Sequence, residues 1–392
     1  MSAFIPGERL RVEPTASGPL DGLRFAVKDL IDVEGVVTGG GNPDWLATHT
    51  EADAHAPAVA MLLAAGAAVD GKTITDELAY SLEGVNAHYG TPLNPRWPHA
   101  LPGGSSSGSA STVASGDVDF ALGTDTGGSV RVPAAFCGLW GIRPTHDAVS
   151  AAGVLPFAPL FDTVGWFART GEMLAKVGDV LLAGTTPVGV PAGFTLCAEA
   201  FAARAANEPD DAAQLRAFAL AAAEAAGSAR PGETNVFDGE QAAWLHCYQQ
   251  LQDDAIRTSL KAWIETTSPR FGDDIASRFA RLDTLEDAEV ARCRERRVDI
   301  ARRIDALVAD AVIVLPTTPL ALLKKDSPSE RIASFYRDAL TMDSIAALAG
   351  LPQVTVPLAD ERDRPLALSL IGPHGSDRAL IALARRLFPS VE

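Results

Sequence analysis

A strand–helix–strand pattern in the first 73 residues places the strongest limit on the fold of this chain. Residues 23–27 (LRFAV) form a short apolar run of strand length, and Lys28 follows where the run meets polar residues. Residues 55–66 (HAPAVAMLLAAG) have apolar residues at helical spacing, with Gly66 at the position of a C-terminal cap, and a second strand-like run, AVDGKT, follows. Because parallel neighbouring strands need a crossover helix, this order predicts an α/β sheet.

The composition of the chain changes past its middle. Residues 200–310 are rich in Ala, Glu, Arg, Asp and Gln with helical periodicity, whereas 311–317 (AVIVLPT) and 353–357 (QVTVP) are typical of buried strands. We therefore expect a single domain over residues 1–392. Its α/β core would span about 1–195 and 310–392, with a mainly helical insertion at about 200–310 that contributes to the substrate pocket.

Charge and apolar patterning exclude two classes of partner. The net charge is −17, and the basic clusters at Arg292–Arg303 and Arg385–Arg386 alternate with apolar residues as solvated helix faces do, so we expect no nucleic-acid partner. The N-terminus lacks the apolar region of a secretory signal, and the longest uncharged run, 180–198, is broken by Gly, Pro and Thr. We expect a cytoplasmic protein without a membrane partner.

Metal and cofactor motifs are absent from the sequence. Four cysteines lie far apart, with no C-x-x-C motif and no neighbouring histidine at ligand spacing, which indicates reduced, mostly buried thiols: Cys137, Cys197, Cys247 and Cys293. Histidines do not pair at H-x-x-x-H spacing, and no G-x-G-x-x-G or Walker sequence occurs, so we expect neither a metal nor an organic cofactor. The carboxylate pairs Asp29/Asp32 and Asp76/Glu77 are typical of turns and helix starts, which ranks glycosidase chemistry low.

Two glycine- and serine-rich stretches are candidates for a site. GTDTGGS at 123–129 follows a short strand, and its glycines allow several backbone N–H groups to point the same way, which creates an anion site or, beside a nucleophile, an oxyanion hole. The nucleophile would be Ser129, flanked by Thr126, Gly127 and Gly128. A glycine-rich turn with an incidental serine fits the same residues equally well.

The other stretch, LPGGSSSGS at 101–109, contains a G-x-S-x-G pattern centred on Ser106, as in the nucleophile elbow of α/β-hydrolases. The preceding segment has three prolines and is no strand, so we set the elbow aside. A lysine at the end of an apolar strand is usually a surface residue, and for Lys28 alone this is the expected interpretation. If it is buried, desolvation lowers its pKa and leaves a neutral amine able to act as a base for a serine.

These segments together resemble the amidase signature family. The resemblance rests on residues 102–145, on AVKDL around Lys28, and on VIVLPTTP and LAGLPQVTVPL later in the chain, so it covers most of the sequence outside the helical insertion. It implies the amidase-signature fold, which is a large twisted mixed β-sheet flanked by helices. GGGNPDWLATH and GKTITDELAYSLEGVNAHYGTPLNP resemble short members that include plant indole-3-acetamide amidohydrolases.

The resemblance also implies the catalytic residues, a Ser–Ser–Lys triad. Ser129 matches the nucleophile, Ser105 the bridging serine that follows a cis peptide bond, and Lys28 the base. The oxyanion hole matches the backbone N–H groups of residues 126–129, and Gly103 and Gly104 are the candidate substrate contacts.

Two positions depart from the family pattern. Ser107 stands where the family usually has glycine, and His146-Asp147 replaces the usual tyrosine-glycine. Neither departure removes a triad residue.

The implied activity is hydrolysis of the C–N bond of a small carboxamide through an acyl-enzyme, with release of ammonia or an amine. Three alternatives stay open: hydrolysis of carbamoyl or urea-derived amides, a glutaminase-type subunit of an amidotransferase complex, and a triad-bearing scaffold without activity. Substrate specificity is expected to lie in residues 145–310. The expected partner is a small-molecule amide, and a homodimer is the assembly to be tested.

Overall fold

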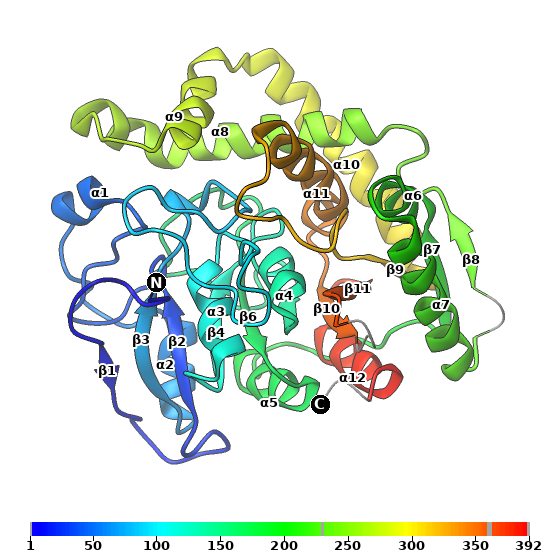
Figure 1. The fold of residues 1–392 in the computed structure, drawn as a ribbon, viewed down its shortest axis with the longest axis horizontal. Helices are drawn as coiled ribbons and strands as arrows, with labels where there is room; N and C mark the ends of the chain where they lie inside the picture. Colours follow the sequence, from blue (N-terminus) through cyan, green and yellow to red (C-terminus); the bar gives the residue numbers. More distant parts are fainter. Residues whose placement is uncertain (1, 229–230, 359–362, 390–392) are drawn as a thin grey trace.

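A computed structural model describes residues 2–228, 231–358 and 363–389 (Figure 1). In these residues, eleven strands form one sheet in the order β1-β3-β2-β4-β6-β5-β10-β11-β9-β7-β8. The strands are β1 (Arg11–Val12), β2 (Arg24–Lys28), β3 (Ala68–Thr73), β4 (Phe120–Thr124), β5 (Trp140–Arg143), β6 (Val164–Ala168), β7 (Gly193–Cys197), β8 (Gly232–Thr234), β9 (Ala311–Pro316), β10 (Gln353–Leu358) and β11 (Leu366–Ile371). Strand β2 runs parallel to β3 and β4, and β7 runs parallel to β8 and β9, whereas the other neighbours are antiparallel. The predicted mixed α/β sheet is confirmed.

Twelve α-helices accompany the sheet in the described part of the chain. They are α1 (Pro43–Thr48), α2 (Pro57–Ala64), α3 (Ser107–Ser115), α4 (Arg131–Cys137), α5 (Gly171–Leu181), α6 (Ala198–Asn207), α7 (Pro209–Ala225), α8 (Gln241–Thr267), α9 (Asp273–Ala280), α10 (Asp287–Asp310), α11 (Ser329–Ala349) and α12 (Asp377–Leu387). Short 3₁₀ turns lie at Glu77–Ala79 and Arg281–Thr284. Gly66 follows the C-cap of α2 with a φ of +99°, as its predicted capping position requires. No helix in residues 2–228, 231–358 or 363–389 has the length and apolar character needed to cross a membrane.

The two faces of the sheet have different helices packed on them, as the alternation of side chains along β2 illustrates. Phe25 and Val27 join a cluster with Val59 and Leu62 of α2, together with side chains of α5, α7 and α12. Ala26, between them, points to the opposite face and packs with small residues of α3 and α4. Small side chains on this second face let α3 and α4 lie close against the strands.

The segment between β7 and β9 is mainly helical, in agreement with its composition. It carries α6, α7, α8, α9 and α10, and within it the short strand β8 extends the sheet beside β7. Helices α8, α10 and α11 pack against one another on the side of the sheet drawn uppermost in Figure 1. The predicted boundaries of the core and the insertion stay a prediction.

The two glycine- and serine-rich stretches both lead into helices near the carboxyl ends of β2 and β4. Strands β2 and β4 are parallel neighbours, so Lys28 and Thr124 lie at carboxyl ends that meet. The stretch at 101–109 enters α3 at Ser107, and the stretch at 123–129 continues from β4 into α4. Loops at the carboxyl ends of parallel strands are where ligands bind in open α/β sheets.

Candidate active site

Lys28 is a buried residue at the end of β2, with no exposed side-chain surface. Its Nζ atom donates hydrogen bonds to Ser105 Oγ at 2.7 Å and to Thr124 Oγ1 at 2.8 Å. The apolar residues before Lys28 are buried in the core, so the strand that they form places the lysine at its end in the interior as well. The alternative of a surface lysine is therefore wrong.

Burial lowers the pKa of the Lys28 amine from 10.5 to about 7, because an ammonium loses its hydration in this site. Asp76, Asp125 and Asp162 oppose this change, since their carboxylates favour the charged amine. Near neutral pH a large share of Lys28 is accordingly neutral and able to accept a proton from Ser105.

Ser105 is fully buried and is held by its backbone as well as by Lys28. The peptide bond between Gly104 and Ser105 is cis. The carbonyl oxygen of Ser105 accepts hydrogen bonds from Asp76 N at 3.1 Å and from Thr75 Oγ1 at 3.0 Å. These two hydrogen bonds to the Ser105 carbonyl fix the backbone, and its side-chain hydroxyl contacts Lys28.

Ser129 lies in the loop between β4 and α4, where it is 4% exposed. Its carbonyl oxygen accepts a hydrogen bond from Ser106 N at 3.2 Å, so the two glycine- and serine-rich stretches are joined next to Ser105. The backbones at Ser105–Ser106 and at Ser129 are therefore neighbours, although they are distant in sequence. The sequence predicted this convergence only through the family resemblance.

The carboxylate of Asp125 organises the loop that carries Ser129. It accepts hydrogen bonds from Gly128 N at 3.0 Å and Val130 N at 3.0 Å, on either side of the serine. The Gly128 N–H is thus turned toward Asp125 and is engaged within the loop. Of the four N–H groups predicted for an oxyanion hole, those of Thr126, Gly127 and Ser129 remain as candidates.

Two buried arginines hold Asp125 in place. Arg131 Nη2 lies 2.6 Å from Asp125 Oδ1, and Arg143 Nη1 donates to the same oxygen at 3.2 Å and to Thr126 O at 3.1 Å. Burial opposes ionisation of Asp125, but these guanidinium groups outweigh it and hold the pKa of the carboxyl well below its usual range.

The same network reaches α11, because Arg131 Nη1 lies 2.7 Å from Asp343 Oδ1. Sequence reasoning missed Asp125, Arg131 and Asp343. Asp125 and Arg131 stand six residues apart inside the TDTGGSVR motif, and this spacing of opposite charges was the available signal.

A small cavity lies beside Ser129. Its volume is about 10 Å³, which is room for about one water molecule. The cavity is lined by residues of several segments: Ala79, Tyr80, Ser81, Leu82, Thr126, Gly127, Phe157, Gln252, Tyr336 and Leu340. Phe157 and Gln252 come from the region in which specificity was expected, whereas Tyr80 and Tyr336 come from outside it. The expectation that specificity lies in 145–310 stays a prediction, to which the cavity lining adds Tyr80 and Tyr336 as candidates.

Gly103 and Gly104 do not line this cavity, and packing explains why they are glycines. A Cβ on Gly104 would lie 2.1 Å from Asp76 Oδ2, and one on Gly103 would lie 2.9 Å from the Cα of Pro133. Ser106 also has a structural role, because its Oγ donates to Thr124 O at 3.2 Å. This hydroxyl joins the α3 loop to the end of β4.

The positions that depart from the family pattern lie in ordered structure. Ser107 is the first residue of α3 and is buried. His146 Nε2 lies 3.0 Å from Pro159 O, and Asp147 has a φ of +64°. None of these three residues lines the cavity beside Ser129.

The chain is similar in sequence to known amidases over nearly its whole length. Residues 8–188 and 206–381 match the family described as Amidase. It is 38% identical to Amidase 1 of Arabidopsis thaliana, over 98% of this chain and 97% of that protein, and 36% identical to Amidase 1 of Oryza sativa subsp. japonica, over 99% and 95%. It is also 31% identical to one subunit of the glutamyl-tRNA(Gln) amidotransferase of Halobacterium salinarum, over 98% of each chain.

Solved structures resemble this fold closely. An allophanate hydrolase of Kluyveromyces lactis superposes with a TM-score of 0.83 at 27% identity, over 95% of this chain and 62% of that one. A structure described as an amidase superposes with a TM-score of 0.82 at 25% identity, over 95% and 85% of the two chains.

Proposed function

Because this chain belongs to the amidase family, we propose that it hydrolyses the C–N bond of a small carboxamide through Lys28, Ser105 and Ser129. Membership of the family makes the chain an amidase, and the proposal adds the residues and the substrate class. The observation that carries it is the 2.7 Å hydrogen bond between Lys28 Nζ and Ser105 Oγ, in a buried site where the lysine pKa is about 7. A lysine that is neutral near pH 7 matches the requirement of a general base.

In the acylation step, neutral Lys28 takes the proton of Ser105, and Ser105 takes the proton of Ser129 as Ser129 Oγ attacks the amide carbonyl carbon. The carbonyl π electrons move onto oxygen, and the backbone N–H groups of Thr126, Gly127 and Ser129 stabilise the resulting oxyanion. When the C–N bond breaks, the proton returns through Ser105 to the leaving nitrogen. Ammonia or an amine departs, and the acyl group remains as an ester on Ser129.

In the deacylation step, water attacks the ester carbonyl and its proton passes through Ser105 to Lys28. The C–O bond to Ser129 then breaks, and Ser129 recovers a proton from the same relay. The carboxylic acid leaves, and the three residues return to their starting protonation states. This cycle needs no metal and no organic cofactor.

The residues that line the cavity support a small, uncharged acyl group. Tyr80, Phe157, Tyr336 and Leu340 give it an aromatic and aliphatic wall, and none of its lining residues in the described ranges is charged. An aryl ring is chemically compatible with such a wall, but the cavity of about 10 Å³ must widen to admit one.

Charged side chains contact this wall from behind, since Tyr80 OH bonds to Asp253 and Arg281, and Arg278 lies over the Tyr336 ring. The lining therefore does not exclude the charged groups of glutamine. The similarity to one component of an amidotransferase keeps the glutaminase alternative open, and ammonia release by the purified chain decides between the two.

The proposal is tested by ammonia release from a panel of aryl-acetamides, aliphatic amides, amino-acid amides and carbamoyl compounds. Ser129→Ala, Ser105→Ala and Lys28→Ala should each lower kcat/KM by roughly 10³-fold or more, as removal of a triad member does. Ser107→Ala is the matched control, because Ser107 is a buried serine in the same stretch and its Oγ has no hydrogen-bond partner among the described residues. Near-normal turnover by Ser129→Ala would exclude the assignment.

Two further readouts separate the alternatives. A fluorophosphonate should label Ser129 alone, whereas labelling of Ser106 would support the elbow. Release of ammonia from simple amides by the purified chain, without ATP or a partner, distinguishes an amidohydrolase from a component of an amidotransferase.

A further inference from the structure

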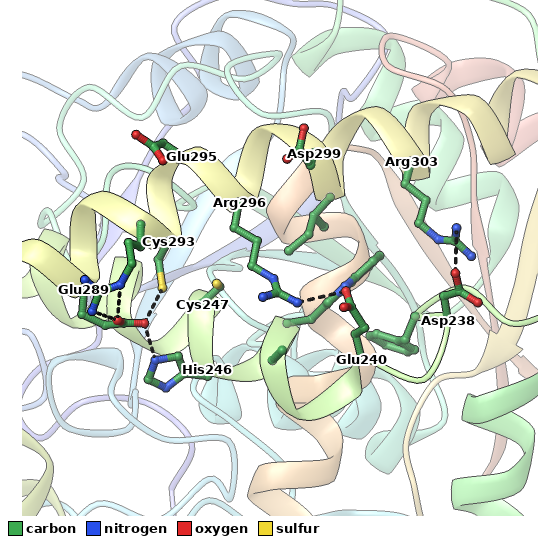
Figure 2. A pocket seen from close by; sticks show the side chains of 15 residues that line it. Asp238, Glu240, His246, Cys247, Glu289, Cys293, Glu295, Arg296, Asp299 and Arg303 are labelled. Atoms are coloured by element: carbon green, nitrogen blue, oxygen red, sulfur yellow. Dashed lines mark hydrogen bonds and ion pairs between the residues drawn. The ribbon is translucent and has the colours of Figure 1, made fainter.

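A second cavity lies between helices α8 and α10, separate from the one beside Ser129. Its volume is about 740 Å³. At one end, side chains of both helices converge on Glu289 (Figure 2). His246 belongs to α8, and Glu289 and Cys293 are one helical turn apart on α10, so both project from the same face of that helix.

The converging side chains offer three atoms that can bind a metal ion: an imidazole nitrogen, a carboxylate oxygen and a thiol sulfur. Glu289 Oε1 lies 2.9 Å from His246 Nε2 and 3.6 Å from Cys293 Sγ, and all three atoms lie within 4.8 Å of one another. Tetrahedral ligands at ordinary zinc distances of about 2.0–2.3 Å lie roughly 3.5 Å apart. The three atoms therefore require shifts of only about 1 Å to surround a common centre of that size.

We propose that His246, Glu289 and Cys293 form a binding site for a divalent transition-metal ion with the ligand preferences of Zn²⁺. A thiolate, an imidazole and a carboxylate are all zinc ligands, whereas Ca²⁺ and Mg²⁺ select oxygen ligands. Because all three residues line the cavity, a water molecule could complete a tetrahedral set of ligands. The ion would link α8 to α10.

The surroundings of the three ligands suit this role. The second carboxylate oxygen of Glu289 is held by Arg292, whose Nε donates to it at 2.8 Å, and this leaves Oε1 directed at His246 and Cys293. Cys293 is 1% exposed, whereas the His246 side chain is 52% exposed. The site is thus anchored in the core by the thiol and is reached from solvent through the imidazole.

The sequence did not predict this site, because its expectation of no metal rested on ligand spacing along the chain. Here the ligands come from two helices, 43 and 47 residues apart in sequence. Among the residues that the structure describes, no other group of three such side chains converges in this way. The site is also independent of the amidase mechanism, since none of its three residues lines the cavity beside Ser129.

The test uses the full chain, freed of metal with a chelator and kept reduced with a phosphine. Co²⁺ serves as the spectroscopic probe, because a cobalt–thiolate bond gives a charge-transfer band and tetrahedral cobalt absorbs strongly in the visible. We expect saturable binding of one Co²⁺, its displacement by Zn²⁺, and a melting temperature that rises with Zn²⁺ concentration.

Variants identify the ligands. Cys293→Ser should abolish the thiolate band, and His246→Gln should weaken Zn²⁺ binding by at least roughly 10–100-fold, the loss that even an outer-shell change causes. Because His246 is half exposed, its substitution leaves the core packed and keeps the test informative if the Cys293 variant fails to fold.

Cys197→Ser is the matched control. Its thiol is also buried and also lies near a carboxylate, with Sγ 3.7 Å from Glu199 Oε2, yet it belongs to no group of three ligands among the described residues. It should bind Zn²⁺ as the wild type does. The proposal is overturned if the reduced wild type binds no metal, if the cobalt spectrum lacks the thiolate band, or if Cys247→Ser rather than Cys293→Ser removes it.

Discussion

Replacing Lys28 with methionine is expected to stabilise the folded protein while it removes activity. Burial lowers the pKa of this lysine from 10.5 to about 7 and outweighs the attraction of Asp76, Asp125 and Asp162. At about 1.4 kcal/mol for each pH unit, holding the amine in this site costs roughly 5 kcal/mol of folding free energy. Methionine keeps a side chain of similar length and removes that cost.

The sign of the pH dependence follows from where protons are bound. Unfolded chains hold the lysine proton up to a pH of about 10.5, whereas the folded protein releases it above about 7. Between these values the unfolded state binds more protons, so the contribution of Lys28 to stability rises with pH. The cost of the buried amine is present in full below about pH 7 and is gone above about pH 10.5.

The methionine variant also loses the hydrogen bonds to Ser105 Oγ and Thr124 Oγ1. Two buried hydroxyls that lose a partner offset about 2–3 kcal/mol of the gain. A net stabilisation of about 2–3 kcal/mol is therefore expected at pH 7. The advantage should shrink by about 1.4 kcal/mol for each pH unit above 7 and vanish near pH 9.

Urea unfolding of the wild type and Lys28→Met at a series of pH values from 7 to 9.5 measures this difference. Titrating groups that do not interact with Lys28 cancel in the comparison, whereas Asp76, whose pKa Lys28 lowers, contributes at the lower end of this range. Lys72→Met is the matched control, because Lys72 is equally buried but pairs with Asp29 at 2.9 Å. Lys72→Met leaves the buried Asp29 carboxylate without its ion pair and should destabilise the fold by about 3–5 kcal/mol. A Lys28→Met protein less stable than the wild type at pH 7, or a difference that does not change with pH, would refute the reasoning.

Three further predictions concern activity and packing. With a base whose pKa is about 7, kcat/KM for ammonia release should fall about tenfold per pH unit well below pH 7 and level off above it, and a limb near pH 10 would contradict the role of Lys28. Gly104→Ala should prevent correct folding, because its Cβ would lie 2.1 Å from Asp76 Oδ2, whereas Gly184→Ala, which meets nothing within 4 Å, should melt as the wild type does. Leu340→Ala should enlarge the cavity and raise kcat/KM for a bulkier acyl group, relative to a small one, by roughly tenfold, and an unchanged ratio would remove Leu340 from the substrate wall.

Much of the fold was accessible from local patterns. The run LRFAV, the amphipathic segment after it and the run AVDGKT predicted a parallel strand pair with a crossover helix, which β2, α2 and β3 confirm. The composition of 200–310 indicated helices for the same reason, since periodicity is a property of adjacent residues. The order of the strands in the sheet was not accessible, because pairing between segments hundreds of residues apart leaves no mark on local spacing.

The sequence by itself determined which residue types are available for the site. These are a lysine at a strand end and serines among glycines, which let two backbone segments approach closely. Only the tertiary structure decided the protonation state of Lys28 near neutral pH, because its pKa depends on how far the surrounding core excludes water. The structure also decided that Gly128 N–H is held by Asp125, and that Tyr80 and Tyr336 meet in one wall. Desolvation and contacts between distant segments are properties of the packed chain, so they cannot be predicted from local sequence patterns.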